Sequence, residues 1–228
     1  MQNIGERLST IKQRINNACL KVGRPTDSVT LVGASKKKPP ELIAQFYNHG
    51  LTDVGENYLQ EASDKRLALD VLELNWHFIG QIQSNKTKTI AENFSWVHGI
   101  DRLKIATRLG QQNPYPNKAI NLLVQLNPDN EPSKGGVTPE QASELCMQIA
   151  EIENVSIRGF MMIPKARDSF KEQKQVFSIA QEQLELTNQR YGLQLDSLSM
   201  GMSGDLEAAI AAGSTIVRVG TDLFGARE

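Results

Sequence analysis

The chain has 228 residues, of which 39% are apolar and 22% charged, and it carries a formal net charge of −1 at pH 7. This near-neutral balance argues against a nucleic-acid partner, because binding a phosphate backbone needs a clustered basic face. No stretch approaches the roughly 18 apolar residues of a membrane span. The N-terminus lacks the apolar core of a secretory signal, so we expect a cytosolic protein with no membrane partner.

The first element along the chain is a helical pattern at residues 4–22. Its apolar side chains repeat roughly on one face, at Ile4, Leu8, Ile11, Ile15 and Leu20. The pattern includes Cys19, which, like the distant Cys146, has no companion at metal or disulfide spacing. We therefore expect both thiols in the core.

Short apolar runs then alternate with longer helical patterns. The strand candidates are residues 29–34, 53–55, 76–80, 96–100, 121–127, 157–163, 195–200 and 216–220. The helical patterns between them are residues 41–49, 59–72, 86–94, 103–112, 139–152, 170–190 and 206–212. This alternation is typical of βαβ units with a parallel sheet. It predicts an α/β fold, a (β/α)8 barrel forming a single domain over residues 1–228, with the leading helix either plugging the bottom of the barrel or packing outside it.

The expected helix ends carry the residues that normally begin and end helices. Thr138 followed by Pro139 is typical of an N-cap and a first helical position. Gly50, Gly192 and Gly213 lie just past three of the helical patterns, where glycine readily ends a helix.

Lys36 ends the first apolar strand, and the carboxyl ends of strands are where barrels of this type hold their functional residues. A lysine directed into a partly desolvated mouth loses its proton more easily and can form imines with carbonyl compounds. The alternative is a solvated surface lysine, which the neighbouring Lys37 and Lys38 would also fit.

The segments MGMSGD (200–205) and STIVRVGT (214–221) follow or form the last two strands. Small hydroxyls, glycine backbone and a helix start make an anion cradle, so Ser203, Gly220 and Thr221 are candidate phosphate ligands. The alternative is that the glycines only turn the chain and Ser203 caps a helix beginning near Gly204.

Arg218 lies inside a short apolar strand, where an arginine needs an acceptor. The sequence leaves two partners open, a ligand ring nitrogen or carboxylate, or a buried ion pair across the barrel.

His77 and His98 also lie within strands, without the companions of a metal site. We therefore expect hydrogen-bonded core histidines.

Eight segments, in order along nearly the whole chain, resemble the pyridoxal phosphate homeostasis protein family. They are LVGASKKKP, DVGENYLQE, WHFIGQIQSNK, FSWVHGIDR, QLNPDNEPSKGG, GFMMIP, LSMGMSGDLEAAIAAGST and VRVGTDLFGAR. That family is similar to the barrel domain of fold-type III enzymes such as alanine racemase. The resemblance implies the cofactor pyridoxal 5′-phosphate (PLP), bound as an imine on Lys36. It also implies further roles, with the phosphate on Ser203, Gly220 and Thr221, the pyridine nitrogen facing Arg218, and Asn57 and Met162 lining the pocket.

The expected function is therefore PLP homeostasis, in which the chain holds the cofactor and releases or transfers it, with PLP-dependent apoenzymes as recipients. An arginine beside the ring nitrogen makes the ring a weak electron sink, so we expect no robust catalysis. The chain also ends eight residues after Gly220, without the C-terminal domain of fold-type III racemases. This again argues against robust catalysis, and it favours a monomer. The alternatives are an amino-acid racemase, with Tyr58 as a stray base, a lysine-imine aldolase that binds no PLP, and a structural or signalling protein.

Overall fold

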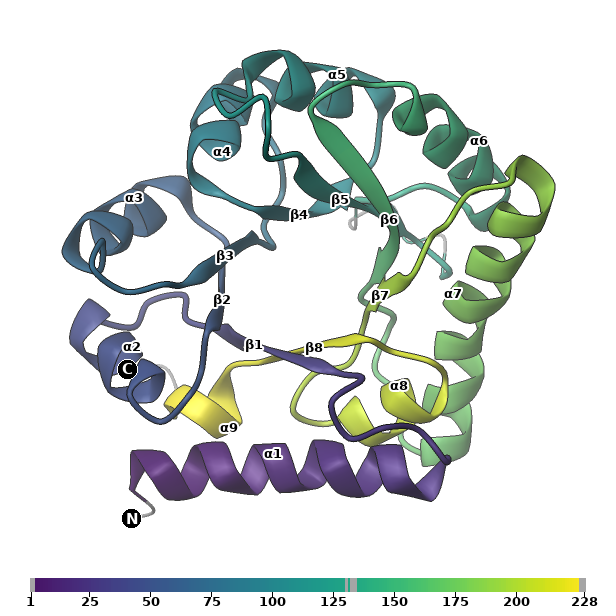
Figure 1. Cartoon of the computed structure of the whole chain (residues 1–228). Coiled ribbons are helices and arrows are strands. Elements are labelled where there is room, and N and C mark those ends of the chain that lie inside the picture. The colour runs from purple at the N-terminus through teal and green to yellow at the C-terminus, as the bar shows by residue number, and fades with distance from the viewer. Residues whose placement is uncertain (1–2, 130, 132–134, 226–228) are drawn as a thin grey trace.

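Eight parallel strands close into a barrel in the computed structural model, which describes residues 3–129, 131 and 135–225 (Figure 1). The strands are β1 (Thr30–Ala34), β2 (Asp53–Glu56), β3 (Asn75–Phe78), β4 (Trp96–Ile100), β5 (Ile120–Leu126), β6 (Val155–Met162), β7 (Ser197–Ser199) and β8 (Ile216–Val219). Each strand pairs with the next one, and β8 pairs back onto β1 with Val32 opposite Arg218. The predicted (β/α)8 barrel is confirmed.

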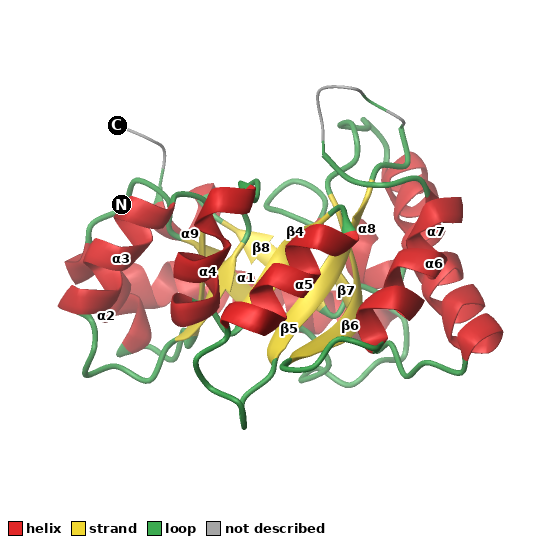
Figure 2. Ribbon diagram, turned by 90° about the horizontal axis from the view of Figure 1, so that it is seen from above, coloured by secondary structure: helices red, strands yellow, loops and turns green. Residues whose placement is uncertain are grey.

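Helices cover the outside of the strands (Figure 2). They are α1 (Ile4–Lys21), α2 (Pro40–Tyr47), α3 (Leu59–Ala68), the 3-10 turn η1 (Ser84–Lys86), α4 (Thr87–Asn93), α5 (Leu103–Gln112), α6 (Pro139–Ala150), α7 (Phe170–Tyr191), α8 (Leu206–Ala211) and α9 (Thr221–Phe224). Thr138 caps α6 through the N–H of Gln141, and Gly192 ends α7 with a φ of 66°. Within the described residues, no helix has the length and apolar character that crossing a membrane requires.

The leading helix α1 packs outside the barrel rather than plugging its bottom (Figure 1). Leu8, Ile11 and Ile15 are buried against residues of α2, α8, β8 and α9. Leu20 was expected on this face, but it is 65% exposed, because Ala18 and Cys19 take the buried positions in the last turn. Cys146 is buried as well, as predicted, and burial raises the pKa of its thiol to about 12.

Several boundaries differ from the sequence prediction. Helix α3 ends at Ala68, where the pattern continued to residue 72. The cause is a turn in which Leu72 N–H donates to Leu69 O, and these leucines contact the core from outside a helix. The short helix α9 was not predicted. Residues 130 and 132–134 of the QLNPDNEPSKGG segment and residues 226–228 lie outside the described residues.

The strand β6 contains a bulge that only glycine fits. Its pairing with β5 shifts between Leu122 and Leu123, and Gly159 there has a φ of 144°. A Cβ at this position would lie 2.1 Å from the carbonyl oxygen of Ser197. The atom in the way belongs to the backbone of β7, so it cannot move aside cheaply.

We therefore expect Gly159→Ala to lower the free energy of unfolding by about 2 kcal/mol or more, from the clash and the backbone strain together. Urea unfolding followed by circular dichroism measures this loss. Gly204→Ala is the matched control, because no atom lies within 4 Å of a Cβ there. Equal stability of the two variants would contradict the prediction.

Candidate cofactor site

Lys36 lies two residues past the end of β1, in a turn beside β2 and β8. Ser35 N–H donates to Gly55 O at 3.0 Å, which joins this turn to β2. On the other side, a Cβ at Gly220 would lie 3.3 Å from the carbonyl oxygen of Ala34. Lys36 is partly buried, whereas Lys37 is exposed. The structure thus places Lys36, Gly220 and the end of β8 side by side at the carboxyl end of the barrel.

The two predicted phosphate loops meet at the same end. The backbone N–H of Arg218 donates to Gly201 O at 2.9 Å, which ties β8 to the start of the loop that carries Ser203. Ser203 does not cap a helix, because α8 begins at Leu206 with Asp205 at its N-cap. The Asp205 carboxylate instead accepts from Met202 N–H at 2.6 Å, which closes the loop around Ser203. The capping alternative for Ser203 is therefore wrong.

Arg14 on α1 holds both loops, a role that no local pattern in the sequence indicates. Its guanidinium donates to Ser203 O at 2.8 Å and to the Glu207 carboxylate at 2.7 Å. It also donates to Asp222 on α9 at 2.9 Å. An arginine within an amphipathic surface helix is ordinary, and only the packing of α1 against α8 and α9 reveals its partners.

Arg218 is buried inside the barrel, with 5% of its surface exposed. Its guanidinium donates to Ser199 O at 2.7 Å, to Ser199 Oγ at 2.5 Å and to Met162 O at 3.1 Å. Burial lowers the pKa of Arg218 to about 10, against the opposing charge of Asp205. The guanidinium is therefore still protonated at neutral pH. All three acceptors are neutral, and Arg218 forms no ion pair among the described residues. The predicted alternative of a buried ion pair is therefore wrong.

A chain of hydrogen bonds crosses the barrel interior from Arg218 to the opposite end. Ser199 Oγ lies 2.8 Å from His98 Nδ1, and His98 Nε2 lies 2.9 Å from His77 Nδ1. His77 Nε2 in turn lies 3.0 Å from the Asp53 carboxylate. Both histidines are buried and hydrogen-bonded, as predicted. We call Asp53, His77, His98 and Ser199 the barrel relay.

The donor of each hydrogen bond in the barrel relay follows from the groups at its two ends, the Asp53 carboxylate and the Arg218 guanidinium. The Asp53 carboxylate can only accept, so His77 carries its proton on Nε2 and accepts at Nδ1. His98 then donates from Nε2 and accepts at Nδ1 from the Ser199 hydroxyl. Ser199 accepts from Arg218, which can only donate. Every hydrogen bond thus points from the arginine toward the carboxylate, and both imidazoles are neutral.

The pKa values agree with this assignment. Burial, followed by the charges of His77 and Arg218, holds the pKa of His98 well below its usual value. Burial also lowers the pKa of His77, although Asp53 opposes it. Burial would raise the pKa of Asp53, but hydrogen bonds from groups that include His77 and Thr52 outweigh it and lower that pKa.

The remaining predicted residues lie near this end of the barrel with different surroundings. Asn57 follows β2, and its side-chain oxygen is buried without a hydrogen-bond partner among the described residues. It also lines a pocket of about 630 Å³ beside Tyr58 and Gly80, the one predicted cofactor residue to do so. Met162 offers its carbonyl to Arg218, while its fully buried side chain packs in the core. Its role as a wall of the cofactor pocket stays a prediction.

These residues fit a ligand with three kinds of group. The amine of Lys36 suits a carbonyl carbon, the loops at Ser203 and Gly220 suit an anion, and Arg218 suits an acceptor atom. The side-chain oxygen of Asn57, buried without a hydrogen-bond partner among the described residues, offers such a molecule a polar contact. PLP has all of these features, an aldehyde, a phosphate and a ring nitrogen.

The fold and this arrangement define a class of barrel proteins. The family model described as "Alanine racemase, N-terminal domain" matches residues 8–228, so the chain belongs to that family. Over all 228 residues the chain is 46% identical to the Pyridoxal phosphate homeostasis protein of Pseudomonas aeruginosa PAO1, and it covers 97% of that relative. Within the wider family, the chain is therefore a member of the pyridoxal phosphate homeostasis proteins.

Solved structures agree with this placement. PipY of Synechococcus elongatus PCC7942, in a structure with PLP bound, is 33% identical and superposes with a TM-score of 0.86 over 98% of this chain and 100% of PipY. The D-threonine aldolase of Filomicrobium marinum superposes with a TM-score of 0.74 at 17% identity, so that likeness concerns the fold alone. That superposition covers 96% of this chain but 59% of the aldolase.

Proposed function

We propose that this chain holds PLP as an imine on Lys36 and takes part in PLP homeostasis by releasing the cofactor or passing it to apoenzymes. The other residues of the proposed site are Asn57, Met162, Ser203, Arg218, Gly220 and Thr221. When bound, PLP supplies an aldehyde that exchanges one amine for another. The resemblance in sequence to named homeostasis proteins and the PLP-bound PipY structure support this proposal.

The observation that carries a binding role rather than an enzymatic one is the state of Arg218. With a pKa of about 10, it is protonated at neutral pH and can only donate. A donor at the ring nitrogen favours the unprotonated ring, which stabilises a carbanion poorly. Amino-acid chemistry on PLP depends on that stabilisation, so a racemase is the weaker alternative.

The second acid or base that a racemase needs is a further point of contrast. Tyr58, the candidate from the sequence, is 55% exposed beside the pocket at Asn57 and Gly80. The residue is therefore poorly shielded from water, which weakens its use as a positioned base. A lysine-imine aldolase is also disfavoured, since such an enzyme would not bind PLP.

We expect the purified protein loaded with PLP to exchange the α-hydrogen of L- or D-amino acids far more slowly than the order of 1 per second typical of enzymes. Proton NMR in deuterated water measures this exchange directly. Turnover at or above that rate would establish an enzyme and overturn the binding role. A protein that takes up no PLP at all would instead favour the aldolase.

Three further expectations belong to the same proposal. The chain acts as one domain, is a monomer, and works in the cytosol. Light scattering of the purified protein with and without PLP tests the monomer. Mixing the loaded protein with a PLP-requiring apoenzyme tests transfer, which should restore the activity of that enzyme faster than spontaneous release allows.

A further inference from the structure

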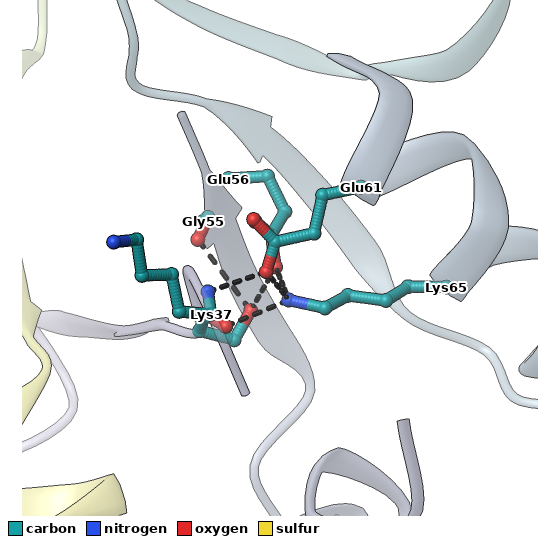
Figure 3. A network of polar contacts seen from close by, with 6 residues as sticks. Lys37, Gly55, Glu56, Glu61 and Lys65 are labelled. Carbon is teal, nitrogen blue, oxygen red and sulfur yellow. Dashed lines mark hydrogen bonds and ion pairs between the residues drawn. The ribbon is translucent and has the colours of Figure 1, made fainter. Parts of the chain in front are cut away.

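The peptide groups on both sides of Lys36 are held by side chains of α3. Before Lys36, the carbonyl oxygen of Ser35 accepts from Lys65 Nζ at 2.7 Å. After Lys36, the N–H of Lys37 donates to the carboxylate of Glu61. Figure 3 shows the side chains of Glu61 and Lys65 reaching toward the backbone of this turn at Lys37. Lys36 thus lies between two anchored points of the backbone.

A buried carboxylate completes the arrangement. Lys65 Nζ also donates to Glu56 at 2.6 Å and to Glu61 at 2.7 Å. An ammonium group has three hydrogens, so these contacts, together with the Ser35 carbonyl, use all of them. Ser35 Oγ in turn donates to Glu56 at 2.6 Å. We call Glu56, Glu61 and Lys65 the Lys65 clamp.

The Lys65 clamp is a poor source of stability. Glu56 is fully buried and Lys65 is 3% exposed, and Glu56 Oε2 has no hydrogen-bond partner among the described residues. Apolar residues of similar size usually serve a core as well as a buried ion pair does, because removing charges from water is costly. What the clamp provides instead is a defined geometry at the turn.

That turn needs support, because its backbone is unusual. Lys37 has a φ of 60°, in the left-handed region that few residues other than glycine adopt. The bond from Lys37 N–H to Glu61 helps to hold this conformation. The direction in which the chain leaves β1, and so the placement of the Lys36 side chain, depends on it.

We propose that Glu56, Glu61 and Lys65 are positioning residues that set the reach of the Lys36 amine toward the PLP aldehyde. This inference rests on the proposed function, because it concerns how fast the imine forms. Misplacing a reacting group by about 1 Å can slow a reaction on the order of 100-fold, so a relaxed turn should slow this step more than it weakens binding.

Two variants disrupt the Lys65 clamp without leaving a lone buried charge. Glu61→Ala removes the acceptor of Lys37 N–H from a position that is partly exposed. Glu56→Leu combined with Lys65→Met removes the buried pair. Stopped-flow absorbance should show imine formation with PLP slowed about tenfold or more in each. Pyridoxine 5′-phosphate, which has no aldehyde, should bind each variant within about twofold of the wild type, since the phosphate loops and Arg218 are untouched.

Glu61→Gln keeps an acceptor at the same place and should restore most of the rate. Asp64→Ala is the matched control, because it removes an exposed carboxylate of α3 outside the clamp. An unchanged rate of imine formation would overturn the positioning role. A loss of affinity for pyridoxine 5′-phosphate as large as the loss of rate with PLP would overturn it too. A wild-type protein that forms no imine would instead refute the proposed function itself.

Discussion

Replacing Lys36 with alanine is expected to abolish the imine with PLP. The wild type should absorb in the visible range after PLP is added, and borohydride should fix the reduced cofactor on the Lys36 peptide. The variant should show neither signal, because the amine that attacks the aldehyde is gone. Absorbance spectra and peptide mass spectrometry measure both effects.

Lys37→Ala is the matched control for this experiment. Lys37 is exposed and adjacent in sequence, and its backbone N–H, which contacts Glu61, survives the substitution. We expect the control to keep the visible absorbance and the label on Lys36. A labelled Lys36→Ala protein would move the imine to another lysine, and a wild type without colour would overturn PLP binding altogether.

Acidification is expected to destabilise the protein through the barrel relay. His77 and His98 have lowered pKa values in the folded state, so the unfolded state binds more protons below about pH 6.5. Stability is therefore full above that pH and falls as the pH decreases toward the folded pKa values. Each fully neutral buried histidine contributes a slope of about 1.4 kcal/mol per pH unit in that window.

Urea unfolding at a series of pH values from about 7 down to 5 measures this slope, before most carboxylates titrate. His98→Gln should be less stable at neutral pH but should show a flatter slope, since one of the titrating groups is gone. His49→Asn alters the exposed histidine outside the barrel relay and is the matched control for the substitution. A wild-type stability that is flat across this window would refute neutral relay histidines.

The same titration bears on Arg218. Protonating His98 places a hydrogen on Nδ1, so it no longer accepts from Ser199, and the hydroxyl loses the orientation in which it meets the guanidinium. The barrel relay therefore connects acid stability with the geometry of the proposed PLP site. The connection passes through neutral imidazoles, which is possible because the cation and the carboxylate lie at opposite ends.

Local pattern in the sequence was sufficient for the alternation of strands and helices, and for placing Lys36, Ser203 and Gly220 at strand ends. Side-chain periodicity is a property of neighbouring residues, so the chain displays it directly. The helix ends at Thr138 and Gly192 followed for the same reason. The roles of Ser203, Gly220 and Arg218 toward PLP came from the resemblance to a family and stay proposals.

Tertiary structure alone decided which side chains meet. The barrel relay joins residues of β2, β3, β4 and β7, and the Lys65 clamp joins α3 to the turn at Lys36. Closure of the barrel brings β8 beside β1, and the packing of α1 outside it gives Arg14 its partners. Such contacts depend on strand register and helix placement between distant segments, which no local periodicity encodes.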